Sequence, residues 1–354
     1  MDHKFSCLTI KVSIIDRMNE AQNIPVSIVY YRLIALWVLC EAMVGGIIHA
    51  AKIPVSGLIV GNCAVVCICL IAFYNPTKGV IIKATIIVAI FKMILSPQAP
   101  PLAYLAVFFQ GLMGELLFWN KNFFRLACVL FGVIALLESG LQRIIVLTIV
   151  YGNDFWKAIN DFINDLTKQK KFTNYSLIIA ISYVTIHLIA GLIVGWWAGS
   201  IPEKVIKWKE QKTSANKITV EADLSFEKIK KKKWLKKGVL IIWTCLILLC
   251  CQSYFKIGRP ILPSDLTLQI FIRSVIIILA WYFLIGPLIS FLIKNWLLRK
   301  QLRSQEEIQR ITQLLPEMQR SISESWKRSK EKKGIKRIGL FAKNVFVNIL
   351  INAR

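Results

Sequence analysis

The sequence predicts an all-α, polytopic helical membrane protein with a six-helix bundle, a two-helix hairpin and cytoplasmic amphipathic helices. Three observations predict this class. Hydrophobic residues make up 56% and charged residues 18% of the 354 residues, whereas a soluble domain has about 25% charged residues. The apolar residues gather into runs long enough to cross a bilayer, and the basic residues gather between the runs. These features exclude an ordinary cytosolic enzyme, a disordered chain and a small disulfide scaffold.

Eight apolar segments each approach the roughly 20 residues that a membrane-spanning helix needs. They are 27–50, 55–73, 79–96, 101–118, 123–151, 175–198, 238–255 and 267–293. Two short loops containing Pro76 and Pro97–Pro101 separate neighbouring helices, because proline ends one helix and starts the next. The fifth segment is unusually long, so we expect it to be tilted or to break near Gly140.

The polar segments divide the chain further. Residues 152–174 carry apolar side chains at helical spacing, which predicts an amphipathic helix on the membrane surface. The predicted organisation is a cytoplasmic N-terminal segment (1–26), a six-span bundle (27–200), a basic linker (201–237), a two-span hairpin (238–298) and a basic amphipathic tail (299–354). Pro316 and Gly334 are expected to divide the tail into about three short helices.

The distribution of basic residues predicts the orientation. With a cytoplasmic N-terminus, the inner segments contain 33 Lys and Arg residues and the outer segments 7. Basic residues concentrate on the cytoplasmic side of membrane proteins. We therefore expect a multi-pass protein of the cell inner (plasma) membrane with both termini in the cytoplasm. The net charge of +25 then indicates contact with membrane lipids rather than with nucleic acid.

Polar residues inside apolar helices are costly and are functional candidates by default. The candidates for binding a ligand are Glu41, Gln110, Glu115 and Glu138. For Glu41 and Glu115, a binding role and an ion-pair role are both open, and the partner of Glu115 must come from another helix. Lys83 and Lys92 are expected to extend toward opposite membrane surfaces, as long basic side chains near helix ends do.

Several other patterns predict packing rather than chemistry. Gly57 and Gly61, and Gly191, Gly195 and Gly199, recur at four-residue spacing, which lets helices pack closely within one chain. His187 is alone on its helix and is expected in the core. Cys63, Cys67 and Cys69 lack neighbouring metal ligands, so they are expected to be core residues. No catalytic, metal-binding or cofactor-binding motif occurs, so the sequence predicts no enzyme activity, metal or cofactor.

The first 200 residues resemble the substrate-binding component of energy-coupling factor vitamin transporters. The resemblance lies in six short spans, in Lys92–Pro101 (KMILSPQAPP) and in the following Phe109–Glu115 (FQGLMGE). The last two spans and the basic helices are similar to part of that family's transmembrane coupling component. The resemblance implies a bundle that binds a small molecule and a tail that docks on a separate cytoplasmic ATPase.

The expected function is therefore that of a transport component whose bundle binds a small molecule. Within the tail, the residues expected to dock a partner are Trp326, Lys333, Gly334 and Arg337. The tail is equally compatible with an amphipathic helix on the inner leaflet. Two other functions remain open: a membrane enzyme acting on a lipid-linked substrate, and a scaffold or assembly protein whose tail recruits a partner.

Overall fold

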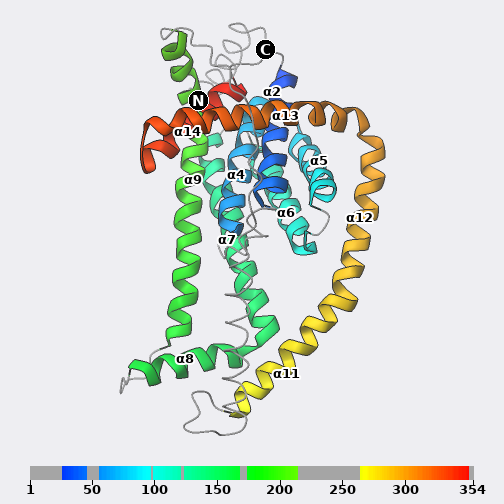
Figure 1. Ribbon diagram of the computed structural model, residues 1–354, viewed down its shortest axis with the longest axis vertical. Coiled ribbons are helices and arrows are strands. Elements are labelled where there is room, and N and C mark those ends of the chain that lie inside the picture. Colours follow the sequence, from blue (N-terminus) through cyan, green and yellow to red (C-terminus); the bar gives the residue numbers. More distant parts are fainter. Residues whose placement is uncertain are drawn as a thin grey trace. The chain divides into compact units, whose positions relative to one another are not determined.

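The computed structural model describes residues 26–45, 56–96, 99–120, 123–167, 174–213 and 264–350, and all regular elements in them are helical (Figure 1). The described residues up to Thr213 form α2 (Val26–Val38), the π-helical η1 (Leu39–Val44), α4 (Ser56–Tyr74), α5 (Val80–Leu95), α6 (Pro101–Leu117), α7 (Phe124–Tyr151), α8 (Asn153–Thr167) and α9 (Tyr175–Thr213). Those from Ser264 onward form α11 (Ser264–Ala280), the π-helical η3 (Trp281–Ile285), α12 (Gly286–Arg303), α13 (Gln305–Arg328), the 3₁₀ turn η4 (Ser329–Glu331) and α14 (Ile335–Leu350). The predicted all-α class is confirmed for these residues.

Four helical stretches are long and apolar enough to cross a membrane. They are Gly57–Tyr74, Phe124–Tyr151, Tyr175–Val205 and Gln269–Arg303, and Pro101–Leu117 is a shorter apolar helix. Helices also occupy the other predicted positions of the N-terminal bundle, but α5 has 16 residues and is about 24 Å long, less than the roughly 30 Å of a bilayer core. The predicted segment 238–255 lies outside the described residues.

The described residues form two compact units. The first contains α2 to α6, α7 up to Leu141, α9 from Val184, and α12 to α14. The second contains the rest of α7, α8, the start of α9, α11 and η3. Both units draw on distant parts of the sequence, so their borders differ from the consecutive segments that the sequence suggests.

Helix α4 lies inside the first unit, whereas α7 and α9 expose most of their apolar side chains. The most apolar stretch of α4 is 67% buried, against 17% for α7 and 11% for α9. The core around α4 is built largely from α2, α4 and α5, with residues such as Leu33, Trp37, Ile68, Ile71 and Ile87 fully buried. Water cannot solvate the exposed apolar side chains of α7 and α9 favourably. These helices therefore have the surface of a membrane protein.

Glycines bring α7 and α9 into backbone contact. A Cβ atom on Gly191 would lie 2.7 Å from the carbonyl oxygen of Gly132, and one on Gly195 would lie 2.5 Å from that of Cys128. Only glycine allows this approach, so the prediction of internal packing is confirmed for this pair. Farther along, Gly140 lies against the buried ring of His187, and α7 continues through Gly140 without a break.

Helix α9 runs on to Thr213, so its end lies within the predicted linker. One predicted helix boundary is wrong. Helix α13 continues through Pro316, where the sequence predicts a break. Proline removes one backbone hydrogen bond, but Ile311 and Met318 on either side are buried. Their packing holds the helix together. Gly334, with φ of +61°, does separate α13 from α14.

The predicted surface helix is α8 in the second unit. It covers Asn153–Thr167, and none of its residues is buried. The indole Nε1 of Trp156 donates a hydrogen bond of 3.0 Å to the hydroxyl of Thr148 at the end of α7. Gly152, with φ of +77°, makes the sharp turn between the two helices. The helix is thus confirmed, and its position on the membrane surface remains a prediction.

Candidate functional site

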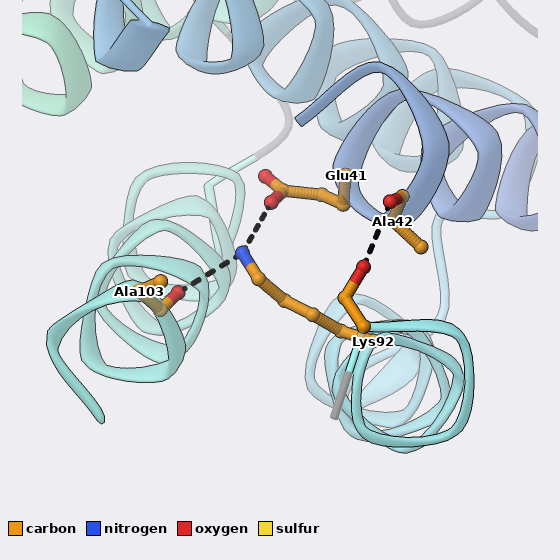
Figure 2. Close-up of polar contacts among 5 residues, drawn as sticks. Glu41, Ala42, Lys92 and Ala103 are labelled. Atoms are coloured by element: carbon orange, nitrogen blue, oxygen red, sulfur yellow. Dashed lines mark hydrogen bonds and ion pairs between the residues drawn. The ribbon is translucent and has the colours of Figure 1, made fainter. Parts of the chain in front are cut away.

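A buried ion pair joins η1 to α5 inside the first unit. The ammonium Nζ of Lys92 lies 2.7 Å from Oε2 of Glu41 and donates a second hydrogen bond of 3.2 Å to the carbonyl oxygen of Ala103 (Figure 2). The two side chains are only 8% and 3% exposed. Each charge loses its hydration here, so each depends on the other for stability.

The backbone around the pair is held by further contacts. Glu41 lies in the π-helical turn η1, a widened form of helix that is frequent at functional sites. The hydroxyl of Ser96, just after α5, donates a hydrogen bond of 2.9 Å to the carbonyl oxygen of Ala42 (Figure 2). This hydrogen bond joins η1 to the end of α5 and so helps to hold the two charged side chains next to each other.

Lys92 corrects one expectation. The sequence suggested that its side chain extends to the outer membrane surface, but the side chain is buried against Glu41. Glu41 therefore has the ion-pair role that was one of its two expected roles. Lys83, in contrast, is half exposed and forms an ion pair with Glu307 of α13. Since 51 residues separate Glu41 from Lys92, helical spacing could not reveal their contact.

Glu115 stabilises the first turn of α5. Its carboxylate accepts hydrogen bonds from the backbone N–H groups of Gly79 at 2.5 Å, Ile81 at 3.1 Å and Ile82 at 3.4 Å. The first N–H groups of a helix have no partner within the helix, and the helix dipole favours a negative charge there. As expected, the partner of Glu115 comes from another helix, but it is the backbone.

The cap by Glu115 yields a first prediction. Glu115→Ala removes the acceptor of three N–H groups, so we expect it to lower the free energy of unfolding by about 1–2 kcal/mol. The measurement is thermal unfolding of the purified protein in detergent. Glu203→Ala is the matched control, because the Glu203–Arg125 pair is 51% and 67% exposed and contributes about 0–1 kcal/mol. Equal losses in the two variants would contradict the capping role.

Glu41 and Glu115 do not share one pocket. Glu115 binds the start of α5 at Gly79, whereas Lys92 lies in the last turn of that helix. Thirteen residues of helix separate these positions by about 20 Å. A small cleft beside Glu115 is lined by the α4–α5 loop and the end of α6, and includes Asn75, Lys78 and Trp119.

Several buried polar atoms of the first unit have no hydrogen-bond partner within the described residues. They include Trp37 Nε1, Asn62 Oδ1, Tyr104 OH, Gln110 Oε1 and Glu138 Oε2. Buried polar atoms usually have a partner in the protein, in water or in a ligand. Gln110 lies near α4, with its Nε2 3.9 Å from where a Cβ atom on Gly61 would be. Gln110 and Glu138, two of the predicted binding residues, thus each have a buried oxygen atom that could accept a hydrogen bond from a ligand or water.

The basic tail packs on the end of the bundle. The fully buried Arg32 of α2 donates a hydrogen bond of 2.7 Å to Glu317 of α13 and one of 3.4 Å to the carbonyl oxygen of Ile349 in α14. Apolar residues of both tail helices join the same core as α2 and α4. Glu317 lies 285 residues from Arg32 in the sequence, so no local pattern reveals this contact.

The tail residues expected to dock a partner lie at the α13–α14 hairpin. The guanidinium of Arg337 lies 4.1 Å from the ring centre of Trp326, and the ring of Phe341 packs edge-on against that indole. Lys333 is exposed, and Gly334 forms the turn. Trp326 and Arg337 therefore contact each other, while the lysine remains free to meet another surface.

The contact between tail and bundle yields a second prediction. Glu317→Ala leaves the buried Arg32 without its carboxylate partner. We therefore expect the free energy of unfolding to fall by about 1–3 kcal/mol and amide exchange in α13 to become faster. Hydrogen–deuterium exchange measures both the place and the size of the change. Glu307→Ala on the same helix is the matched control, because its partner Lys83 is 53% exposed and the pair contributes about 0–1 kcal/mol. Unchanged exchange in Glu317→Ala would show that this contact does not hold the tail.

Within the described residues, no three His, Cys, Asp or Glu side chains are grouped so that they could hold a metal ion. The thiols of Cys67, Cys69 and Cys128 are buried in the apolar core.

Comparisons with protein families, with curated proteins and with solved structures give no significant match. The function must therefore be argued from the site itself.

Proposed function

We propose that this chain is an integral membrane transport component, which binds a small molecule in its helical bundle and is coupled through its basic tail to a separate ATPase. The observation that carries the proposal is the buried Lys92–Glu41 pair. A buried ion pair is often no more stabilising than apolar residues of similar size. Ionisable residues within membrane helices are typically retained for binding or transport.

The chemistry of the pair suits a polar ligand. Lys92 has three N–H donors, and two of them bind Glu41 and Ala103. Trp37, at the end of α2 just before η1, and Tyr104, beside Ala103 in α6, each have a buried polar atom without a partner in the described residues. A small molecule carrying both hydrogen-bond donors and acceptors would satisfy such groups, as is usual in ligand sites.

The orientation of the chain is part of the proposal. The excess of Lys and Arg in the segments counted as inner supports an inner-membrane protein with cytoplasmic termini. The tail then lies in the cytoplasm, within reach of an ATPase. Helix α2 and η1 carry both Arg32, which binds the tail, and Glu41, which binds Lys92. A ligand that moves Glu41 would therefore move Arg32 as well, through the continuous helical segment α2–η1, and so alter the contact between Arg32 and the tail.

The test of ligand binding compares the wild type with Glu41→Leu/Lys92→Met. The double variant removes both charges together, so we expect it to stay folded because no unpaired buried charge remains. Native mass spectrometry of detergent-solubilised wild type should detect a retained small molecule that the double variant lacks. A folded double variant that retains the same molecule would contradict the assigned site. A wild type that binds nothing from a metabolite extract would contradict the function.

The test of coupling asks whether the tagged full chain, purified from its own cells, retains ATPase subunits. We expect a stable complex whose ATP hydrolysis rises when the retained molecule is added. Glu317→Ala should weaken this response without abolishing ligand binding, because it acts on the tail rather than on the bundle. An ATPase rate that never responds to the ligand would contradict the coupling role.

A further inference from the structure

We propose that the α13–α14 hairpin binds anionic lipid headgroups of the inner leaflet. The hairpin tip, residues 326–338, carries seven basic residues and one acidic residue, Glu331. Six of the basic side chains are exposed: Lys327, Arg328, Lys330, Lys332, Lys333 and Lys336. The inference goes beyond the transport function and rests only on the proposed orientation of the chain.

Apolar side chains accompany these charges on the hairpin. Trp326 is 45% and Ile338 is 62% exposed, although most other apolar side chains of α13 and α14 pack into the core of the bundle. An indole and an aliphatic side chain among lysines form the pattern of a segment at a membrane surface. Arg337 lies over the indole and keeps Trp326 in a fixed position.

Contacts with α9 place the second half of the tail's last helix near the depth of the lipid headgroups. Trp196, near the end of the apolar stretch of α9, is 68% exposed, and exposed tryptophans at such ends lie at the interface between membrane and water. Its neighbour Trp197 packs edge-on against Phe346 of α14. Lys343 of α14 lies over Trp208, farther along α9. Helix α14 therefore lies beside α9 at this level.

These observations favour lipid over an acidic protein. The hairpin crosses α9 and its tip extends sideways beyond that helix (Figure 1), so the tip lies outside the bundle. A lipid surface accepts both kinds of exposed side chain, because the indole and isoleucine enter the headgroup region while the lysines meet the anionic headgroups. Each Lys or Arg near an anionic surface strengthens binding about fivefold, or about 1 kcal/mol.

The experiment uses the full chain in nanodiscs, with a photo-reactive benzoyl-phenylalanine at position 338. One set of discs contains phosphatidylcholine alone, and the other contains phosphatidylglycerol as well. We expect several-fold more lipid adduct in the phosphatidylglycerol discs, decreasing with added salt. Lys330→Gln/Lys332→Gln/Lys333→Gln should remove most of this increase. Arg299→Gln/Arg303→Gln/Arg320→Gln changes the net charge equally at exposed sites outside the hairpin tip and should retain it.

Three outcomes would overturn the inference. The first is equal lipid adduct in the two kinds of disc. The second is an equal loss in the two triple variants, which would reflect total charge rather than the hairpin. The third is an adduct formed with a co-purifying acidic protein in place of lipid. Size-exclusion elution and thermal unfolding of each variant establish that it is folded before the adducts are compared.

Discussion

Lys92→Met is expected to lower the free energy of unfolding by about 3–5 kcal/mol, because it leaves the carboxylate of Glu41 buried without its partner. Glu41 is 3% exposed at its side chain, so water cannot replace the lost ammonium. Methionine is close to lysine in length and flexibility, which limits any cavity. The measurement is thermal unfolding in detergent, followed by the fraction of protein that remains monodisperse.

The double variant Glu41→Leu/Lys92→Met separates loss of pairing from loss of packing. We expect it to recover most of the stability lost in Lys92→Met, since apolar residues often replace a buried ion pair at little cost. The two substitutions should therefore be strongly non-additive. If the losses of the single variants simply add in the double variant, then the side chains act independently and the ion pair is not what stabilises this site.

Gly195→Ala is the second change with a large expected effect. The added methyl group would lie 2.5 Å from the carbonyl oxygen of Cys128 and 2.7 Å from the Cα of Val129, and backbone atoms cannot rotate away as a side chain can. Helices α7 and α9 would have to separate, at an expected cost of about 1–3 kcal/mol. Fluorescence-detected size exclusion after heating measures the resulting drop in unfolding temperature.

Gly199→Ala is the matched control on the same helix. Its added methyl group would meet the Cβ of Cys128 at 3.4 Å and the Cα of Arg125 at 3.5 Å, which are ordinary contact distances. Alanine also favours helix over glycine, so this variant should be as stable as the wild type or slightly more stable. Identical unfolding temperatures for Gly195→Ala and Gly199→Ala would mean that α7 and α9 do not pack this closely.

The spacing of the glycines predicts close helix packing, but it does not show which glycines touch the backbone of a neighbouring helix. Gly191, Gly195 and Gly199 share the same spacing, yet only the first two meet backbone atoms closer than 3 Å. Pro316 is a similar case, because local propensity predicts a break and the packing of Ile311 and Met318 prevents it. In both cases a neighbouring helix decides the outcome, and the sequence does not say which neighbour that is.

The sequence alone determined the all-helical class, the membrane character and the approximate positions of the described helices. These features follow from the length and composition of consecutive residues. A helix makes its backbone hydrogen bonds within its own segment, so an apolar run can enter lipid as a helix without a partner from elsewhere in the chain. Tertiary structure alone decided that Lys92 pairs with Glu41, that Glu115 caps α5 and that Arg32 holds the tail. These contacts join residues between 33 and 317 positions apart, and such pairing depends on how helices pack rather than on any local pattern.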